Sequence, residues 1–536
     1  MSIHLPHRRG SILAGSVLAV ALVAGGWSVA TPTTQASPKT APTTQQALTA
    51  QLDAILADPR LSGAEAGLTV RNADTGQSLY DANGNERLLP ASNAKVYTTS
   101  AAMDLLGPDY RFDTRVLRSG KVAGHTLLGN LYLKGFGDPT STATDYDTLA
   151  SQVASAGIRY VSGALVADDS FFDSTRLAPF WSWDDEPYYY SAQTSALSIA
   201  PDDIGDTGTV LIDVFPGTRA GDRPRITMTP PNNYVHLVVH ATTGAAGSAS
   251  TMDATREYGK NVVDVTGSIP VGAANYASQP SVDQPTGLAA DVFRAALARH
   301  GVHLSLRPTA YSTTPTAAIT LASHQSQPLA ELLTPLLKLS NNMMAETFTK
   351  AIGRQVSGQG TWGAGTAAIL ADVAKNGADS STLQLFDGSG LGRADYVTTD
   401  QTTNLLTALR AKPWFQSWYD ALPIAGNPAQ LIGGTLRNRL TNTAAANNLH
   451  GKTGSMTGVS ALSGYLTDAG GQHLVFAMMS NNFVQGGITH VEDAVALALA
   501  NYGGTGTAAA TVQPAQSTPA DRDRRSQLEC SWTRSC

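Results

Sequence analysis

Three short motifs supply serine, lysine and asparagine side chains of the kind that form an ester on a serine and then break it. In chain order they are Ser92-Asn93-Ala94-Lys95, Ser340-Asn341-Asn342 and Lys452-Thr453-Gly454. Each motif alone is weak, because a serine and a lysine three residues apart arise by chance in many long chains. The ordered set, in which each member has the surroundings that its chemistry requires, predicts an acyl-serine active site.

The first motif opens a predicted helix that starts near Pro90 and stops at Gly107. Residues three apart on a helix share one face, so the Lys95 amine can reach the Ser92 hydroxyl and take its proton. Lys95 must be neutral to do so, a form that burial and a second cation, Lys452, would favour. N–H groups at the helix start would stabilise developing negative charge. The alternative is an ordinary helix-start serine beside a solvated lysine.

The second motif offers groups that suit a peptide substrate. Ser340 has a hydroxyl that can relay a proton to a leaving amine, and Asn342 has an amide that both donates and accepts. The alternative, a helix N-cap, is compatible with this role. The same pattern recurs at Ser480-Asn481-Asn482, but there it ends a predicted strand and would leave the sheet. We therefore favour Ser340.

The third motif lies on a predicted strand. Gly454 lacks a side chain and would let a substrate backbone approach, while Lys452 and the hydroxyls of Thr453 and Ser455 could hold a carboxylate. The alternative is an exposed edge strand protected by a lysine. We expect the neighbouring His450 to have a structural role.

The elements that must position these motifs predict an α/β fold whose main sheet is antiparallel and flanked by helices. Residues 115–322 have a different sequence pattern, with short strand-like runs separated by Gly, Pro and Asp turns. Helices are expected at 48–56, 90–106, 292–297, 329–337, 343–350 and 491–499, with Pro335 kinking or breaking the fourth. Strands are expected at 67–70, 78–80, 127–133, 163–166, 210–214, 234–239, 449–456, 460–466 and 474–479.

This pattern divides the chain into a main unit and an insertion. The predicted segments are a signal peptide (1–36), a linker (37–46), a discontinuous main domain (47–114 and 323–502), an inserted strand-rich portion (115–322) and a disordered tail (503–536). Cys530 and Cys536 lie in the tail, so no disulfide framework is expected in the core. We expect export, with membrane association only peripheral or through an uncleaved signal.

The composition and charge limit the kinds of binding partner that we expect. The 536 residues carry a formal charge of −6 with scattered basic residues, so nucleic acid is not expected. Neither a Gly-x-Ser-x-Gly elbow nor a His-Glu-x-x-His zinc motif occurs in the sequence. No cofactor or metal is predicted.

Taken with neighbouring stretches, the motifs resemble the penicillin-recognising serine enzymes, and most closely the D-alanyl-D-alanine carboxypeptidase/endopeptidase family, the class C low-molecular-mass penicillin-binding proteins. The supporting stretches are Leu89-Pro90-Ala91-Ser92, Gly135-Phe136-Gly137-Asp138-Pro139, Asp387-Gly388-Ser389-Gly390-Leu391 with Arg393, and residues 451–458. The resemblance implies a β-lactamase/transpeptidase-like domain with a large insertion. One departure is Gly392, where the family often has serine.

The resemblance also implies the reaction. Ser92 would be acylated by the penultimate D-alanine carbonyl of a peptidoglycan stem peptide, with Lys95 as base. Ser340 would pass the proton to the departing D-alanine and Asn342 would bind the substrate amide. Water would hydrolyse the ester, and β-lactam antibiotics would acylate the same serine as covalent inhibitors.

Binding residues are implied in the same way. Lys452, Thr453 and Ser455 would hold the terminal carboxylate, and the backbone N–H groups of Ser92 and Ser455 would form the oxyanion hole. Some members bind the amino-acid end of a diaminopimelate side chain with an acidic residue, an arginine and a methionine. The matching residues here are Asp185, which Asp184 and Glu186 flank, together with Arg393 and Met456.

Two other functions were weighed against an exported serine D,D-peptidase that acts as carboxypeptidase and endopeptidase. A β-lactamase needs a carboxylate base for fast deacylation, and no motif anchors one. A catalytically silent wall-binding or β-lactam-sensing protein has no need of both Lys95 and Ser340. The complete motif set therefore favours the peptidase.

Overall fold

The computed structural model describes residues 44–504. The predicted signal peptide, most of the predicted linker, and the predicted tail from residue 505 onward, with both cysteines, lie outside the described residues. Within the part that is described, no helix is long and apolar enough to cross a lipid bilayer.

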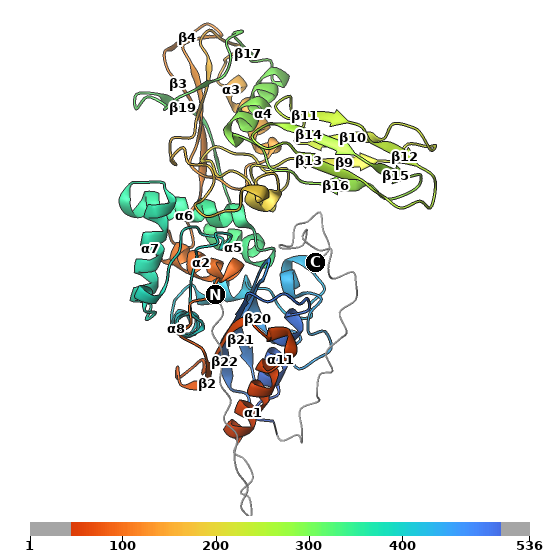
Figure 1. The fold of residues 1–536 in the computed structure, drawn as a ribbon. Coiled ribbons are helices and arrows are strands. Elements are labelled where there is room, and N and C mark those ends of the chain that lie inside the picture. The colour runs from red at the N-terminus through yellow and green to blue at the C-terminus, as the bar shows by residue number, and fades with distance from the viewer. Residues whose placement is uncertain (1–43, 505–536) are drawn as a thin grey trace, which may run out of the picture. The chain divides into compact units, whose positions relative to one another are not determined.

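Five antiparallel strands form the sheet that carries the third motif (Figure 1). In spatial order they are β2 (Ser78–Ala82), β1 (Glu65–Asn72), β22 (His473–Asn481), β21 (Val459–Thr467) and β20 (His450–Met456). The predicted hairpin and the three predicted C-terminal strands are confirmed. Because β1 pairs with β22, the two ends of the described chain share one sheet.

Alternate residues of the central strands enter two different cores. Leu462 and Phe476 pack in a cluster with α1 (Thr44–Leu56) and α11 (Thr489–Ala500). Ala461 and Val475 face the other way, into a cluster that includes α2 (Ala94–Leu105) and α8 (Thr399–Leu409). The sheet is therefore covered by helices on both faces, as the period-two alternation of a strand requires.

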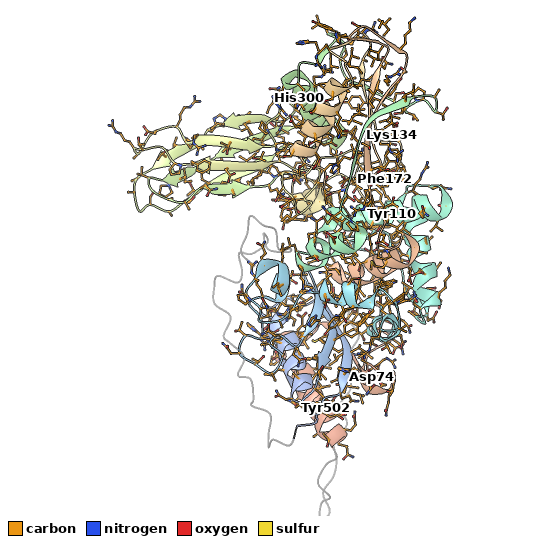
Figure 2. The ribbon with its side chains drawn as sticks, turned by 180° about the vertical axis from the view of Figure 1, so that it is seen from behind. Asp74, Tyr110, Lys134, Phe172, His300 and Tyr502 are labelled. Atoms are coloured by element: carbon orange, nitrogen blue, oxygen red, sulfur yellow. The ribbon has the colours of Figure 1, made fainter. Side chains whose placement is uncertain are left out.

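Helix α1 begins inside the predicted linker. The Gln45 side chain donates to the carbonyl of Leu79 and accepts from the hydroxyl of Tyr502 at 3.1 Å. Figure 2 labels Tyr502. Leu48 and Leu52 are buried, as their spacing predicted. The linker prediction is thus wrong for residues 44–46, because contacts with segments distant in the sequence hold them in the helix.

Three further helices pack near the first two motifs: α5 (Leu329–Lys338), α6 (Asn342–Ser357) and α7 (Trp362–Lys375). The expected break at Pro335 is not found, since α5 continues through that residue to Lys338. Its leucine stripe is buried in the helical core, and this burial offsets the backbone hydrogen bond that a proline cannot make.

The middle of the chain is rich in strands, as predicted, and it has its own hydrophobic core. The strands form five small sheets, with orders β18-β8-β6-β3-β19, β17-β7-β5-β4, β10-β9-β16, β11-β14-β13 and β12-β15. Two helices, α3 (Ala143–Ser155) and α4 (Pro285–Arg299), complete this core.

The strand bounds in this middle part are β3 (Asp113–Arg118), β4 (Lys121–Ala123), β5 (Thr126–Leu128), β6 (Leu131–Gly135), β7 (Tyr160–Val161), β8 (Leu165–Asp168), β9 (Leu211–Phe215), β10 (Arg225–Thr229), β11 (His236–Val239), β12 (Thr242–Gly244), β13 (Asp253–Arg256), β14 (Val262–Thr266), β15 (Ser268–Pro270), β16 (Tyr276–Ser278), β17 (His303–Leu304), β18 (Ala310–Tyr311) and β19 (Ile319–Gln325).

Two details differ from the expected pattern. The run at 127–133 forms two strands, β5 and β6, because the backbone at Gly129 packs so tightly that a Cβ there would lie 2.0 Å from the carbonyl oxygen of Ser119. The first and last strands of the middle part, β3 and β19, pair with each other, and the predicted limits at 115 and 322 fall within them.

Candidate active site

Ser92 lies in a short 3-10 turn, η2 (Ala91–Asn93), that leads directly into α2. The residue before it, Ala91, has a left-handed φ of 45°, and Ser92 itself is only 7% exposed. Gly390 packs against this turn so closely that a Cβ on it would lie 1.9 Å from the Ala91 carbonyl oxygen. The position of Ser92 therefore depends on a loop almost 300 residues later in the chain.

Lys95 is fully buried, and its amine contacts three acceptors. Lys95 Nζ donates to Ser92 Oγ at 2.8 Å, to Asn342 Oδ1 at 2.5 Å and to the carbonyl oxygen of Ser389 at 3.1 Å. The structure thus brings the predicted serine and lysine together and joins them to the second motif. The contribution of Ser389 was missed, because a backbone carbonyl leaves no signal in the residue types.

Ser340, in a left-handed conformation (φ 61°), and Asn341 lie between α5 and α6 as expected, whereas Asn342 is the first residue of α6. The capping residue is neither of the two predicted site residues. It is Asn341, whose side chain accepts from the backbone N–H of Met344 at 2.9 Å. Because Asn341 caps the helix, the side chains of Ser340 and Asn342 are directed elsewhere, and Asn342 Nδ2 donates to the carbonyl of Tyr190 at 2.8 Å.

The third motif lies on β20, which is an edge strand of the five-stranded sheet. Lys452 is nevertheless fully buried, and its Nζ donates to Ser340 Oγ at 2.9 Å. The interpretation as a solvated edge lysine is therefore wrong. Thr453 donates to the Thr435 hydroxyl at 2.7 Å, and Ser455 is exposed.

The first and third motifs also contact each other directly. Asn93 Nδ2 donates to the Lys452 carbonyl at 2.9 Å, and a Cβ on Gly454 would lie 2.5 Å from the carbonyl oxygen of Pro90. Glycine at this position is therefore required by the packing of η2 on β20. That Gly454 also lets a substrate backbone approach β20 stays a prediction.

The alternative serine motif has a different role. Asn481 holds the chain ahead of Ser92, since its Oδ1 accepts from the Leu89 backbone N–H at 2.7 Å. Ser480 is buried on β22, and its hydroxyl is among the buried polar atoms that lack a hydrogen-bond partner. His450 stacks on Tyr419, with ring centroids 4.1 Å apart, and burial lowers the pKa of its imidazole.

The residues expected to read a substrate side chain lie around Tyr190. The Tyr190 hydroxyl donates to Asp185 Oδ1 at 2.8 Å, and Met456 packs in one apolar cluster with Tyr190. Burial raises the pKa of Asp185, whereas the Tyr190 hydrogen bond and the charge of Arg393 lower it. The Arg393 side chain is exposed and donates to the carbonyl of Thr457 at 3.0 Å.

The acidic neighbours of Asp185 are occupied in other ways. Glu186 forms an ion pair with the buried Arg256 at 2.7 Å. Asp184 is exposed, and its carboxylate accepts from the Ser182 hydroxyl. Of the three acids, Asp185 is therefore the one that both contacts Tyr190 and is influenced by Arg393.

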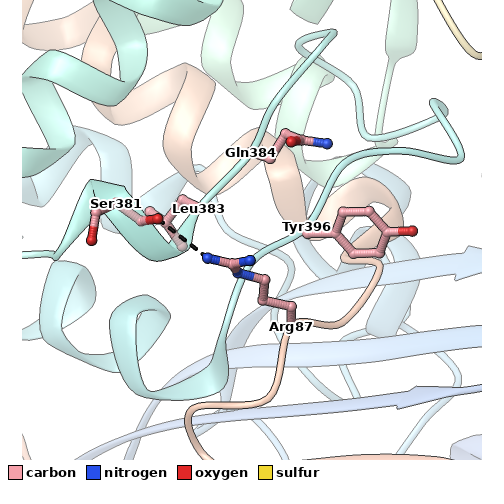
Figure 3. Close-up of a pocket in the computed structure, with 5 residues that line it drawn as sticks. All are labelled: Arg87, Ser381, Leu383, Gln384 and Tyr396. Atoms are coloured by element: carbon pink, nitrogen blue, oxygen red, sulfur yellow. Dashed lines mark hydrogen bonds between the residues drawn. The ribbon is translucent and has the colours of Figure 1, made fainter.

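A shallow pocket elsewhere on the main unit does not include any motif residue (Figure 3). It is lined by Arg87, Ser381, Leu383, Gln384 and Tyr396. The guanidinium of Arg87 donates to the carbonyl of Ser381 at 3.3 Å. Within residues 44–504, no group of three or more His, Cys, Asp or Glu side chains is placed to hold a metal ion.

Comparison with known proteins gives three consistent findings. A model of the D-Ala-D-Ala carboxypeptidase 3 (S13) family matches residues 48–502. A D-alanyl-D-alanine carboxypeptidase from Actinomadura sp. (strain R39) is 40% identical over 491 residues, which are 90% of this chain and 89% of that protein. Carboxypeptidase DacB from Mycolicibacterium smegmatis is 30% identical, covering 86% of each chain.

Among solved structures, penicillin binding protein 4 (dacB) from Haemophilus influenzae has a similar fold. The TM-score is 0.72 at 24% identity, covering 84% of this chain and 99% of that one. A second structure of that protein, in complex with a β-lactam, has a TM-score of 0.65 at 24% identity, covering 83% and 98%. The predicted mixed α/β architecture is confirmed.

Proposed function

The chain belongs to the D-Ala-D-Ala carboxypeptidase 3 (S13) family and is a serine-type D-alanyl-D-alanine carboxypeptidase, and from this premise we propose that Ser92 is its acylated residue. One observation carries the proposal: the amine of buried Lys95 lies 2.8 Å from Ser92 Oγ. A lysine in this position can take the hydroxyl proton as the oxygen attacks.

In the first half-reaction, Ser92 Oγ attacks the carbonyl carbon of the penultimate D-alanine while Lys95 Nζ takes the proton. The backbone N–H groups of Ser92 and Ser455 stabilise the oxyanion. The bond to the terminal D-alanine then breaks, and the proton held by Lys95 passes to its nitrogen through the Ser340 hydroxyl, which leaves Lys95 neutral again. The 2.9 Å contact from Lys452 Nζ to Ser340 Oγ supports this route.

In the second half-reaction, water attacks the acyl carbon, its proton returns through Lys95, and Ser92 leaves with its hydroxyl restored. Asn342 fits the substrate-binding role, because a primary amide has two N–H donors and, within residues 44–504, Asn342 Nδ2 donates one hydrogen bond, to the Tyr190 carbonyl. Lys452, Thr453 and Ser455 hold the carboxylate of the terminal D-alanine.

The finer substrate preference follows from the cluster around Tyr190. Asp185 binds the ammonium and Arg393 the carboxylate of a diaminopimelate side chain, while Met456 packs against its methylene groups. With such a pocket the enzyme also cleaves D-Ala-diaminopimelate cross-links as an endopeptidase. We expect Asp185→Asn to raise KM for a diaminopimelate peptide about tenfold, the effect of one lost charge-assisted hydrogen bond.

Asp184→Asn is the matched control, since it removes an equal charge one residue away. A peptide that ends in D-Ala-D-Ala but has a neutral side chain should be turned over equally well by both variants. If Asp184→Asn raised KM and Asp185→Asn did not, the pocket assignment would move to Asp184.

β-Lactams acylate the same serine in this proposal. Support comes from the Haemophilus penicillin binding protein 4, whose structure has been solved in complex with a β-lactam. The protein works outside the plasma membrane, an inference from the N-terminal sequence pattern alone, and any membrane association is peripheral or through an uncleaved signal.

Intact-protein mass measured after incubation with benzylpenicillin tests the proposal, together with release of D-alanine from a diaminopimelate peptide. We expect one adduct on the wild type, none on Ser92→Ala, and turnover reduced about a thousandfold or more in that variant. A folded Ser92→Ala protein that still carries the adduct would refute the assignment. Rapid drug hydrolysis without peptide turnover would indicate a β-lactamase, and a stable adduct without turnover a sensor.

A further inference from the structure

The loop at residues 387–393 contacts the amine of Lys95, the proposed general base. Its Ser389 carbonyl accepts from Lys95 Nζ at 3.1 Å. The N–H of the same peptide group, which belongs to Gly390, donates to Asp387 Oδ1 at 2.7 Å. In a trans peptide the N–H and C=O groups point in opposite directions, so the Asp387 carboxylate that holds this N–H also aims the Ser389 carbonyl at Lys95.

Asp387 is a fully buried acceptor with three donors. In addition to Gly390, the backbone N–H of Gly392 and the indole Nε1 of Trp181 both donate to its Oδ2 at 2.7 Å. The group that aims the Ser389 carbonyl is therefore a buried carboxyl whose two oxygens both accept hydrogen bonds from the protein.

A second buried acid lies against Asp387. Asp395 Oδ1 accepts from the Phe386 backbone N–H at 2.6 Å, but its Oδ2 has no donor. A Cβ on Gly392 would lie 3.0 Å from Asp387 Oδ2 and 3.2 Å from Asp395 Oδ2, so these two oxygens face the same small space. Two adjacent buried carboxylates cannot both be ionised at a low free-energy cost, and a proton between them removes the conflict.

Among residues 44–504, neither Asp387 nor Asp395 forms an ion pair with a lysine or arginine. Glu346, which is fully buried, accepts from the N–H groups of Gly388 and Ser389 at 3.0 and 2.9 Å and is a third buried acid in this region. Of the nearby cations, Lys95 contacts the loop through the Ser389 carbonyl, and Arg393 contacts the carbonyl of Thr457.

A third cation, Lys350 on α6, is paired with Asp173 at 2.6 Å and lies over the Trp362 ring. Burial, with the Asp387 charge second, raises the pKa of Asp395 well above its usual value. Burial likewise raises the pKa of Glu346 to about 7. These directions agree with the geometry of the pair.

We propose that Asp387 is a positioning residue for Lys95, and that Asp395 contributes a proton, shared with Asp387, that keeps the 387–393 loop in its active conformation. The inference rests on the proposed roles of Ser92 and Lys95 and adds a pair of residues that no motif contains. Loss of the shared proton places two carboxylates in contact, and the loop can then no longer hold the Ser389 carbonyl against the base.

Two nearly isosteric variants separate the roles of the pair. In Asp395→Asn the amide N–H₂ replaces the carboxyl proton as donor to Asp387, and its oxygen still accepts from Phe386. In Asp387→Asn an N–H₂ group must face at least one of the three N–H donors, so a hydrogen bond to the loop is lost. Asp395→Asn should preserve the conformation of the 387–393 loop. Asp387→Asn should free the loop to leave that conformation.

The measurement is the second-order rate of Ser92 acylation by benzylpenicillin, followed by intact mass from about pH 5 to about pH 10, the range in which groups with such shifts titrate. We expect Asp387→Asn to be slower by about tenfold or more, and Asp395→Asn to match the wild type within about twofold at neutral pH. The ratio of Asp395→Asn to wild type should rise as the pH passes the pKa of Asp395, because only the wild type loses the proton. This ratio cancels the titrations of Lys95 and Lys452, which both proteins share.

Thermal unfolding supplies a readout that does not need catalysis. A carboxyl whose pKa is raised on folding contributes stability that is complete below its unfolded pKa, about 3.9, and is lost as pH rises to the folded pKa. Asn has no such loss, so the melting temperature of Asp395→Asn relative to wild type should increase across that window.

Several results would contradict the roles of Asp387 and Asp395. An Asp395→Asn protein that does not fold, that is acylated as slowly as Asp387→Asn, or whose ratio to wild type stays flat with pH would overturn the proposal. So would an Asp387→Asn protein acylated at the wild-type rate. If the wild type itself gained no adduct at Ser92, the proposed function would fail instead, and the unfolding comparison would still test the shared proton.

Discussion

Replacing Gly454 by alanine should both slow acylation of Ser92 and lower the stability of the protein. The added Cβ would lie 2.5 Å from the Pro90 carbonyl oxygen and 3.1 Å from the Asn93 nitrogen, both in the segment that carries Ser92. Ordinary contacts begin near 3.4 Å, so β20 and η2 must separate by about 0.9 Å. Overpacking of this kind costs about 1–3 kcal/mol in stability.

The effect on rate follows from geometry. A displacement of about 1 Å in a reacting group can cost roughly a hundredfold in rate. Because Lys95 Nζ and Ser92 Oγ are 2.8 Å apart, a shift of η2 relative to the Lys452 strand disturbs the alignment of nucleophile, base and carboxylate site together. We therefore expect acylation by benzylpenicillin to fall about thirtyfold to a hundredfold.

Two glycines provide controls for this experiment. On the same strand, a Cβ at Gly451 would meet Ser463 and Leu462 at 3.1 and 3.2 Å, away from Pro90, so Gly451→Ala should lower stability with a smaller effect on rate. Gly363, on α7, has open space around it, and Gly363→Ala should be neutral or stabilising. A folded Gly454→Ala protein acylated within about twofold of wild type, well below the loss that a displacement of this size implies, would show that this packing does not position Ser92.

Three further predictions rest on other contacts. Ser340→Ala should slow acylation by about a hundredfold, the scale of a lost proton relay, whereas Ser480→Ala should change neither rate nor melting temperature; the reverse pattern would move the second motif to Ser480. The Asp138 hydrogen bond raises the pKa of His324, so the stability it contributes is complete below the unfolded pKa, about 6.5, and is lost as pH rises through the folded pKa. The difference in melting temperature between wild type and His324→Gln should therefore shrink on going from about pH 6 to about pH 8, and a constant difference would contradict this. Glu346→Gln should slow acylation about tenfold, because its amide must face one of the loop N–H donors; a wild-type rate in a stopped-flow assay would show that this acid is not needed to hold the loop.

Local features of the chain were predictable from the sequence because they depend on neighbouring residues. The hairpin at β1 and β2, the three C-terminal strands and the order of the motifs all follow from short-range periodicity and turn residues. Local signals failed where distant contacts decide the outcome. α5 continues through Pro335 because its leucine face is buried, and α1 starts early because Gln45 is bound by β2 and Tyr502.

The sequence by itself determined which residue types the active site contains, the spacing that puts Lys95 one turn from Ser92, and the family resemblance that the comparisons confirm. Only the tertiary structure decided that Asn341 is the helix cap, that Lys452 is buried against Ser340, and that Asp387 and Asp395 share one buried space. The physical reason is that burial and hydrogen-bond partnership depend on segments far apart in the chain. In the sequence alone, a buried acid and a solvated surface acid look the same.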